Sequence, residues 1–425
     1  MADASGVEVP GPPVALAVPP SFGRALRSRP FLLLWVSQFI SQTGDFVFDV
    51  ALIWLVLETT GSIFAVGIVV TAALIPTVAL GPVVGVYVDR WSRRTILLVT
   101  NVVEGLLVAA LAGFVLSHEV NLAVIVGIVL ALGAGAQFVR LASNAMVPQT
   151  VAKDDLGPAN GLVQISGSST QVVGLSIGGV VVALLGVDLP ITYDAITFFA
   201  AALIVAFIAR SVGAPEPPAD GQPSSFSREF LEGIRFLRSQ RYLLEIISIG
   251  VVLNFCGNAV FTLWAPYADF VLHGGAATYG FLGAALAVGS ILGALIVGKI
   301  DLRRTVGRVA LAGVVVAGAL VVLLGLTHSI PLALVESFAF GILLSVINVP
   351  LFAAIQAKVP ARLMGRMMAA FLSCILAAAP VGAFFAGAMA EATSVGYVYV
   401  VLGAIMAVMG VVGLSVMGEV RRLAY

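Results

Sequence analysis

Residues 81–116 read GPVVGVYVDRWSRRTILLVTNVVEGLLVAALAGFVL, and this stretch decides the fold. An apolar run ends at the charged turn Asp89-Arg90-Trp91-Ser92-Arg93-Arg94, and a second apolar run follows at once and reaches Leu116. An α-helix needs about 20 apolar residues to cross a bilayer. The stretch is therefore the end of one membrane span, a charged turn at one membrane face, and the next span.

The same alternation continues in both directions along the chain. Hydrophobic residues make up 60% of the sequence and charged residues only 10%, whereas a soluble protein carries about 25% charged residues. We expect spans at about 31–57, 63–85, 95–116, 121–147, 158–186, 190–209, 242–271, 278–298, 306–326, 331–357, 364–390 and 395–417. The predicted fold class is an all-α membrane protein with twelve transmembrane helices.

The basic residues fix the orientation of these helices. Of the 22 Lys and Arg residues, all but Arg140 fall in connections that lie on one side of the membrane. Because basic residues are concentrated in cytoplasmic connections, both termini are predicted to be cytoplasmic, and the protein to reside in the inner cell membrane. The net charge of zero predicts no broad surface for nucleic acid.

The two halves of the chain repeat each other. Val147-Pro148 match Val359-Pro360 at a separation of 212 residues, and Gly44 matches Gly257 at 213, with Asp45 opposite Asn258. Two copies in the same orientation predict two pseudo-symmetric six-helix bundles, the architecture of a transporter with its substrate site between the halves.

The repeat and the linker between its halves predict five parts. We expect a disordered cytoplasmic tail over 1–29, a first bundle over 30–210, a cytoplasmic linker over 211–241, a second bundle over 242–417 and a cytoplasmic tail over 418–425. Within the linker, Phe230, Ile234 and Leu237 share one helical face, which fits an amphipathic helix at the inner membrane surface or a solvated connector.

Span 1 carries an unusual polar stripe. Gln38, Gln42, Asp45 and Asp49 follow one another at spacings of 4, 3 and 4, so they share one face of the helix. Two carboxylates one turn apart disfavour each other's charge, which makes protonation near neutral pH feasible, as proton coupling requires. A hydrogen-bonded packing pair is the alternative.

Other ionisable residues inside spans need a reason because burying them is costly. Arg140 is the only embedded cation, and we expect it to pair with Asp45, Glu104 or Asp89, either to sense protonation or as a structural ion pair. Glu104 and Glu336 are candidates for lining the pathway or binding a cationic substrate. Asp194 is expected near a span end, where water reaches it, and is assigned no role.

Uncharged polar residues inside spans complete the predicted substrate cavity. These are Gln137, Asn144, Gln164, Gln171, Asn254 and Asn258, together with Gln38, Gln42 and Glu336. The three histidines fall in outer connections with no metal-ligand spacing, and no cofactor or metal is expected. No catalytic pattern points to an enzyme.

The charged turn carries a family resemblance. Gly85, Asp89, Arg90, Arg93 and Arg94 match G-x-x-x-D-R-x-x-R-R, and the chain resembles the major facilitator superfamily over about residues 30–420. The resemblance implies that Asp89 and Arg90 act as a latch in gating. Gly174-Leu175-Ser176-Ile177-Gly178-Gly179 looks like the superfamily's antiporter motif, with Leu175 in the place of its proline.

Four longer stretches resemble the bacterial macrolide-efflux and enterobactin-exporter-like branch. They are 31–57, 136–160, 230–238 and 359–367. The resemblance implies a multidrug-type antiporter that exports a lipophilic or amphiphilic small molecule in exchange for protons, and we expect it to be a monomer. An importer or uniporter of the same fold is the nearest alternative, and a non-transporting membrane sensor is another.

Overall fold

The computed structural model describes residues 22–214, 226–300, 302 and 304–424. Twelve helices in this part of the chain are long and apolar enough to cross a membrane, which confirms the twelve predicted spans. The first half holds α1 (Phe22–Arg27), α2 (Arg29–Thr60), α3 (Ile63–Arg90), α4 (Arg93–Leu116), α5 (Leu122–Thr150), η1 (Lys153–Asp155), α6 (Leu156–Leu185) and α7 (Asp188–Ala206).

The second half follows the same plan. It holds α8 (Phe226–Ser239), α9 (Arg241–Thr262), α10 (Trp264–Pro266), η2 (Tyr267–Val271), α11 (Gly275–Lys299), α12 (Val306–Leu326), α13 (Ile330–Lys358), α14 (Ala361–Leu376), α15 (Ala378–Ala392), α16 (Val395–Val416) and α17 (Gly418–Arg421). Two spans are interrupted, the first after α9 and the other at Ala377 between α14 and α15.

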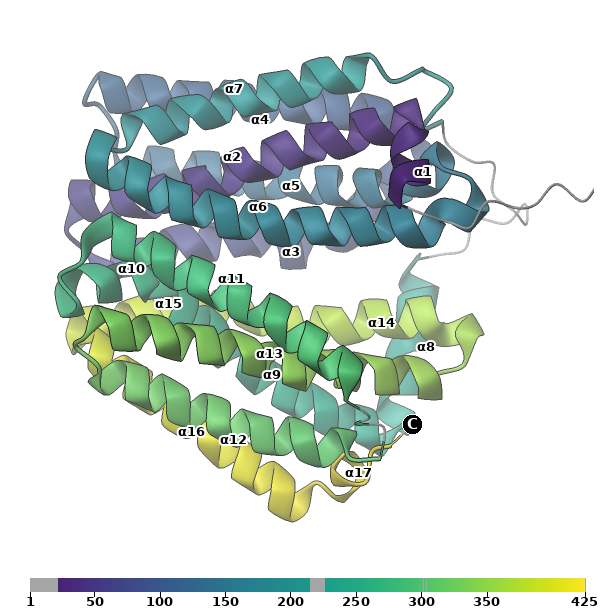
Figure 1. Ribbon diagram of the computed structural model, residues 1–425, viewed down its shortest axis with the longest axis vertical. Helices are drawn as coiled ribbons and strands as arrows, with labels where there is room; N and C mark the ends of the chain where they lie inside the picture. Colours follow the sequence, from purple (N-terminus) through teal and green to yellow (C-terminus); the bar gives the residue numbers. More distant parts are fainter. Residues whose placement is uncertain (1–21, 215–225, 301, 303, 425) are drawn as a thin grey trace, which may run out of the picture.

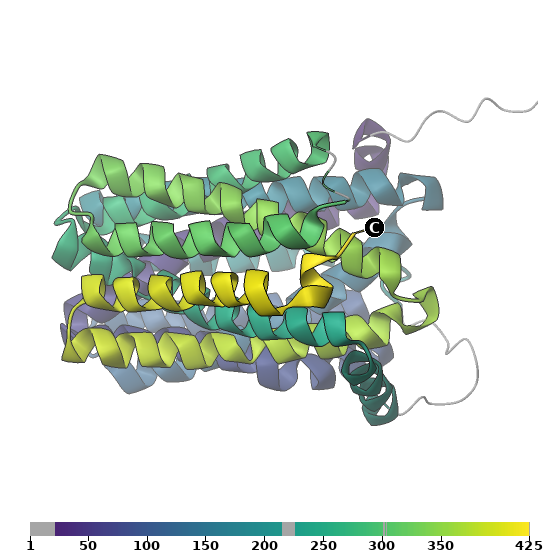
Figure 2. The ribbon, with the colours of Figure 1, turned by 90° about the horizontal axis from the view of Figure 1, so that it is seen from below.

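The helices form two bundles that lie one above the other in Figure 1. α2 to α7 make the first bundle, and α9 to α16 make the second. We call the end of the molecule that carries α1, α8 and α17 the open end, and the opposite end, where α2 is joined to α3, the closed end. Figure 2 shows the long helices running side by side between these two ends.

Backbone-to-backbone crossings join the bundles toward the closed end. α6 crosses α11 at Gly179, where a Cβ atom would lie 2.9 Å from the Gly280 Cα atom. α3 crosses α15 at Gly67, where a Cβ atom would lie 2.9 Å from the Gly387 Cα atom. Because small residues let helix backbones approach closely, both crossings need glycine.

A carboxylate from the second bundle reinforces the α3–α15 crossing. The Ile63 and Phe64 amides, in the first turn of α3, donate hydrogen bonds of 2.7 and 3.1 Å to the Glu391 Oε2 atom. The Thr71 hydroxyl donates to the Pro380 carbonyl at 3.2 Å, and the rings of Phe64 and Phe384 pack edge to face. These contacts hold the closed end shut.

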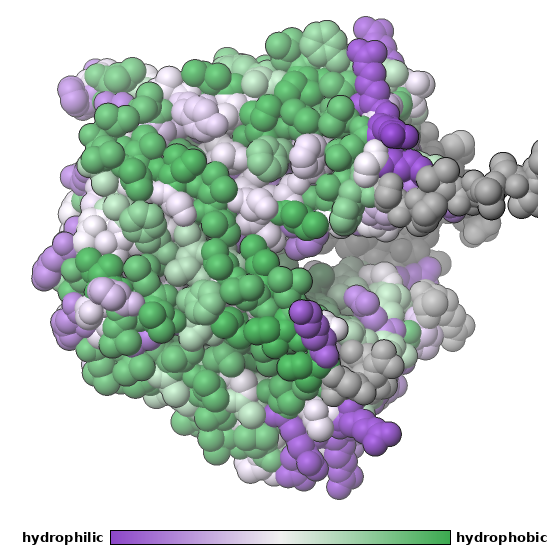
Figure 3. All heavy atoms as spheres, viewed as in Figure 1, coloured by the Kyte–Doolittle hydropathy of each residue, from purple (hydrophilic) through white to green (hydrophobic). Residues whose placement is uncertain are grey.

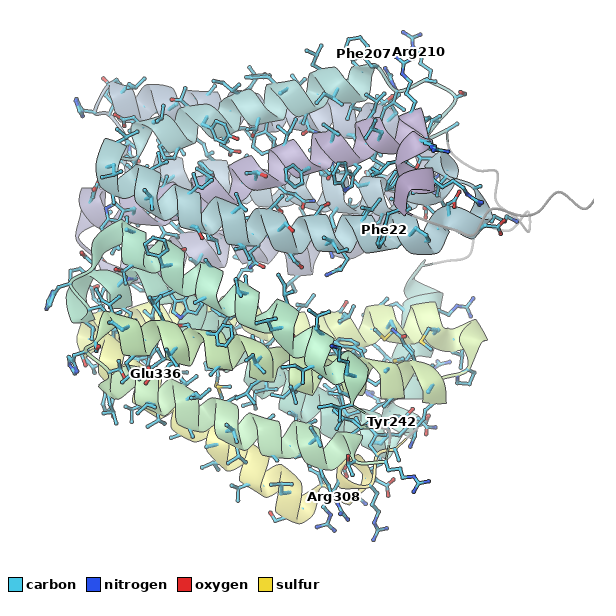
Figure 4. The ribbon with its side chains drawn as sticks, in the orientation of Figure 1. Phe22, Phe207, Arg210, Tyr242, Arg308 and Glu336 are labelled. Atoms are coloured by element: carbon cyan, nitrogen blue, oxygen red, sulfur yellow. The ribbon has the colours of Figure 1, made fainter. Side chains whose placement is uncertain are left out.

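The bundles separate toward the open end. Figure 3 shows the surface hollowed between them on the right, where no helix crossing closes the gap. Figure 4 places Phe22, Arg210, Tyr242 and Arg308 toward this end and Glu336 toward the other, as the distribution of basic residues predicts.

The linker helix packs on the second bundle. α8 lies against α14, where Leu237 is buried and Phe230 and Ile234 cover the core. The Arg366 guanidinium and the Glu232 carboxylate form an ion pair of 2.5 Å between the two helices. The apolar face of α8 is therefore used, at least in part, for docking to protein. Neither prediction for this segment, an amphipathic helix at the inner membrane surface or a solvated connector, included packing against the second bundle.

The predicted N-terminal tail is only partly described. Residues 22–27 form α1, so the expected disorder over 1–29 does not extend to them, and residues 1–21 lie outside the described part of the chain. The Arg24 guanidinium pairs with the buried Asp155 carboxylate at 2.7 Å. This ion pair holds α1 against the start of α6.

Candidate functional site

A cavity of about 440 Å³ lies inside the first bundle. Its wall is built from α2, α3, α4, α5, α6 and α7, without any residue of the second bundle. This differs from the expected substrate site between the halves.

The polar stripe of α2 forms one side of this cavity. Gln38, Gln42, Asp45 and Asp49 all line it, as their helical spacing predicts. The opposite face of α2 is buried in the apolar core of the bundle, so the stripe has no other surface to occupy. Trp35, Phe39 and Phe48 also line the cavity and give it aromatic walls.

Glu104 reaches the cavity from α4. The residue is only 3% exposed, and its Oε2 atom has no hydrogen-bond partner among the described residues. Its other oxygen packs against Gly135 of α5, where a Cβ atom would lie 2.5 Å from Glu104 Oε1. The absence of a side chain at residue 135 therefore makes the space that the carboxyl group occupies.

Asp194 of α7 is a cavity residue that sequence reasoning missed. It was expected near a span end in contact with water, but it is 1% exposed and lines the same cavity. The Thr197 hydroxyl donates to its Oδ1 atom at 3.1 Å, and Oδ2 has no hydrogen-bond partner within the described ranges. Gly44 of α2 leaves the room for both side chains. The packing of α7 against α2 buries Asp194, and no signal within its own helix indicates this.

Arg140 is held by an amide and not by an acid. Its Nη2 atom donates to Gln137 Oε1 at 2.5 Å, and Gln137 Nε2 donates to the Thr77 hydroxyl at 2.9 Å. No ion pair joins Arg140 to a carboxylate among the described residues, so the expected pairing with Asp45, Glu104 or Asp89 is wrong for this structure. Gln137 lies behind Arg140 and does not line the cavity as predicted.

The cavity thus gathers four carboxylates, those of Asp45, Asp49, Glu104 and Asp194, and one guanidinium. The charge on Asp194 lies within electrostatic reach of the other three carboxylates. No group of three or more His, Cys, Asp or Glu side chains within the described ranges is placed to hold a metal ion. The arrangement is suited to binding protons or an organic cation.

The remaining predicted cavity residues divide three ways. Asn144 lines the first cavity, and Asn254 and Asn258 line a second cavity of about 320 Å³ inside the second bundle. Gln164 and Gln171 of α6 line neither.

Glu336 also lies on neither cavity wall, which corrects its predicted role. It is 2% exposed, and it accepts a 2.9 Å hydrogen bond from the Thr327 hydroxyl between α12 and α13. Figure 4 shows it toward the closed end.

The charged turn after α3 has two parts. Asp89 and Arg90 are exposed and have no hydrogen bond or ion pair within the described chain, whereas Arg93 is buried and donates to the Ala214 carbonyl. Arg94 donates to the Ile208 and Ala206 carbonyls at 2.7 and 2.6 Å, which satisfies the end of α7. Gly85, one turn before Asp89, has open space where a Cβ atom would stand. Within this turn, Asp89 and Arg90 are therefore the two charged residues without a partner among the described residues.

A membrane protein of two six-helix bundles, open between them at one end, is built as a transporter. The sequence profile of the Major Facilitator Superfamily matches residues 34–380, so the chain belongs to this superfamily.

Two of the relatives are named as efflux proteins. The multidrug efflux pump Tap of Mycolicibacterium fortuitum is 25% identical over 392 residues, which are 90% of this chain and 94% of the relative. Macrolide efflux protein A of Streptococcus pyogenes is 25% identical over 242 residues, which are 55% of this chain and 58% of that protein.

Solved structures share the fold. The nucleoside transporter NupG superposes with a TM-score of 0.73 at 12% identity, covering 92% of this chain and 99% of that one. A bacterial homologue of the iron transporter ferroportin, in an inward-facing state, gives a TM-score of 0.69 at 14% identity, covering 91% and 98%.

Proposed function

We propose that the protein exports a lipophilic or amphiphilic small molecule in exchange for protons, by alternating access of the two bundles. The observation that carries the proposal is the first cavity, where the carboxylates of Asp45 and Asp49 stand on one stripe with Glu104 and Arg140 nearby. A charge in such a site is costly inside a membrane, so each carboxylate needs a proton or a cationic partner. The similarity to two efflux proteins supports the direction of transport.

The exchange follows from competition for the same cavity. In the state described here, the gap opens at the end that carries the basic connections, which the charge bias assigns to the cytoplasm. Substrate enters there and displaces protons from Asp45 and Asp49. After the bundles rock and the closed end opens, protons from outside return to these carboxylates and release the substrate.

Asp89 and Arg90 contribute at the open end. They have no partner among the described residues in this state, and we propose that they meet charged groups of the second bundle when this end closes. A charged pair with partners in only one state shifts the equilibrium toward that state.

The test is uptake of ethidium, a lipophilic cation, into inverted membrane vesicles under an imposed pH gradient. Wild-type protein is expected to accumulate the dye, and Asp45→Asn and Asp49→Asn to lower accumulation at least about tenfold, a loss of about 1.4 kcal/mol. Asp154→Asn is the matched control, because Asp154 is an exposed aspartate outside the cavity. Accumulation at the wild-type rate in both cavity variants rules out the coupling assignment.

The nearest rival is an importer or uniporter, since the structural neighbours include a nucleoside transporter. Such a protein exchanges labelled for unlabelled solute at the same rate with and without a pH gradient. Gradient-dependent accumulation of dye in inverted vesicles separates the two functions, because a uniporter only equilibrates its substrate.

A further inference from the structure

The second cavity is the internal counterpart of the first. The two occupy equivalent places in the repeated halves, because eight wall residues of the first cavity correspond to eight wall residues of the second. At a separation of 212 residues the pairs are Leu132 and Leu344, Ala136 and Asn348, Val139 and Leu351, Arg140 and Phe352, and Ser143 and Ile355; at 213 they are Ser41 and Asn254, Asp45 and Asn258, and Phe48 and Phe261.

The two cavities differ in charge at these equivalent positions. Asp45 is replaced by Asn258, and Arg140 is replaced by Phe352. The residues that line the second cavity include no ionisable side chain, whereas those of the first include five. A charged ligand group is stabilised in the first cavity, and an uncharged group is the better fit for the second because no buried charge is left unpaired.

Aromatic rings form much of the second cavity's wall. Phe261 and Phe340 have ring centroids 6.4 Å apart and a tilted geometry, and Phe352 and Phe371 pack edge to face at 6.3 Å. Both ring faces and ring edges surround the space. Ligand rings pack well against such walls, because offset and edge-to-face aromatic pairs are favourable.

A few polar atoms remain available to a ligand. Asn258 Nδ2 donates to the Asn254 carbonyl at 2.9 Å, and Asn348 Nδ2 donates to the Leu344 carbonyl at 2.8 Å. The amide nitrogen of Asn254 and the amide oxygens of Asn258 and Asn348 have no hydrogen-bond partner within the described part of the chain. An apolar cavity with a few convergent polar groups is typical of small-molecule sites.

A glycine keeps the space open. Gly257 lines the second cavity, and a Cβ atom there would meet nothing within 4 Å. Its counterpart in the first half is Gly44, where the equivalent space is taken by Asp194 and Thr197. The volume of about 320 Å³ is at the lower end of ligand pockets, which span about 300–1,000 Å³.

We propose that this second cavity binds an uncharged, ring-bearing apolar group, namely the apolar part of the exported compound, while any charged group binds in the first cavity. The identity of the ligand as transport substrate rests on the proposed function; the cavity's preference for neutral rings does not. A lipid acyl chain is the competing occupant, but it has neither rings nor groups that hydrogen-bond to the three asparagines.

Photolabelling with radioactive benzophenone tests the proposal on the full-length protein in lipid nanodiscs. Benzophenone is uncharged and has two rings joined by a carbonyl, which is able to accept a hydrogen bond from the Asn254 amide. On illumination it attaches to C–H bonds that it contacts. Label is expected on α9 and α13 peptides, competed by unlabelled benzophenone.

Two variants change the cavity in different ways. Gly257→Leu fills the space, and Asn258→Asp introduces a charge at nearly constant volume. Each is expected to weaken labelling about tenfold, an effect of about 1.4 kcal/mol. Gly127→Leu is the control, since Gly127 is an exposed helical glycine outside both cavities with nothing within 4 Å of its Cβ position. Monodisperse, cooperatively melting protein is required of each variant.

The outcomes separate the two proposals, because labelling needs no gradient and no turnover. Label on α9 and α13 that both cavity variants reduce supports the neutral-ring site, even where the dye-uptake assay fails. Label confined to outward-facing residues such as Val335, or equal in wild type and Gly257→Leu, overturns it. A phospholipid that copurifies with wild type but not with Gly257→Leu, with α9 unlabelled, also overturns it and identifies an acyl-chain site.

Discussion

Two buried carboxyl groups in the first cavity depend on glycines in neighbouring helices. Gly135 of α5 accommodates Glu104 of α4, and Gly44 of α2 accommodates Asp194 of α7. Each glycine lies on a different helix from the acid that it faces. The acids are therefore placed by helix packing, and a methyl group on either glycine would displace the acid that it faces without changing any polar atom.

Gly135→Ala tests this dependence. The added Cβ atom would lie 2.5 Å from Glu104 Oε1, and overpacking of this kind costs about 1–3 kcal/mol. We expect a lower melting temperature and slower gradient-driven dye uptake. Gly135→Ala combined with Glu104→Asp, which shortens the acid, is expected to recover part of the stability. Gly127→Ala, where the space is open, serves as the control, and equal melting temperatures for the two alanine variants contradict the argument.

Asp194→Asn tests the acid that lies outside the predicted set. Asparagine retains the oxygen that accepts from Thr197 and nearly the same shape, so stability is expected to change little. Removing an ionisable group within electrostatic reach of Asp45 is expected to slow proton-driven uptake about tenfold, equivalent to about 1.4 kcal/mol. Uptake is measured in inverted vesicles between pH 6 and 8. A wild-type rate across that range would show that Asp194 only supports packing.

The site was predictable where one helix carries all the information. Gln38, Gln42, Asp45 and Asp49 share a face by spacing alone, and all four line the cavity. Asp194 and Glu336 were misplaced because depth along a helix does not say which neighbour covers it. Gln137 is on the same helix as Asn144, yet its side chain turns to Thr77 of α3, a contact that only the assembled bundle creates.

At the scale of elements, the α3–α15 crossing joins two spans that are more than 300 residues apart in sequence. The existence and type of both helices followed from apolar length and the basic connections. Their contact did not, because glycine occurs throughout the chain and no pattern within either helix pairs Gly67 with Gly387. The sequence also does not predict which end of the molecule is closed, because that depends on the same contacts between the bundles.

Glu391→Ala tests how the closed end is held. The variant removes the acceptor of the Ile63 and Phe64 amides, and because these hydrogen bonds are exposed to water, the expected net cost in the closed state is about 0.5–1.5 kcal/mol. The equilibrium is expected to shift toward opening at this end. Spin labels at Ser62 and Ser394 are expected to show a new longer-distance population by pulsed electron resonance.

The control for that experiment is Glu119→Ala, a substitution of an exposed glutamate at the same end whose side chain has no hydrogen bond in the structure. It is expected to leave the distance distribution of the wild type unchanged. Indistinguishable distributions for Glu391→Ala and Glu119→Ala would mean that the glycine crossings alone keep this end shut.

At the scale of the whole molecule, the basic connections and the hollow between the bundles lie at the same end. Basic residues gather at the open end, and the connections at the closed end carry none. Because positive connections remain in the cytoplasm, we propose that the state described here faces inward.

Cysteine labelling of whole cells checks this orientation. Cys374 is exposed and is first replaced by serine, while Cys256 is buried. Single cysteines at Ser117 and Ser329, both exposed at the closed end, are expected to react with a membrane-impermeant maleimide added outside. A cysteine at Ser239 is expected to react only after lysis. Reaction of Ser239→Cys in intact cells would reverse the assignment.

The two glycine crossings between the bundles, Gly179 with Gly280 and Gly67 with Gly387, have a consequence for motion. Helices that meet at bare backbone have no interlocking side chains there, so one is able to roll over the other through a small angle without any rotamer change. For the same reason, neither crossing has room for a larger residue in place of glycine. A single methyl group at Gly179 or Gly67 would act as a wedge, and we infer that such a wedged carrier would leak ions across a membrane that it is meant to keep sealed.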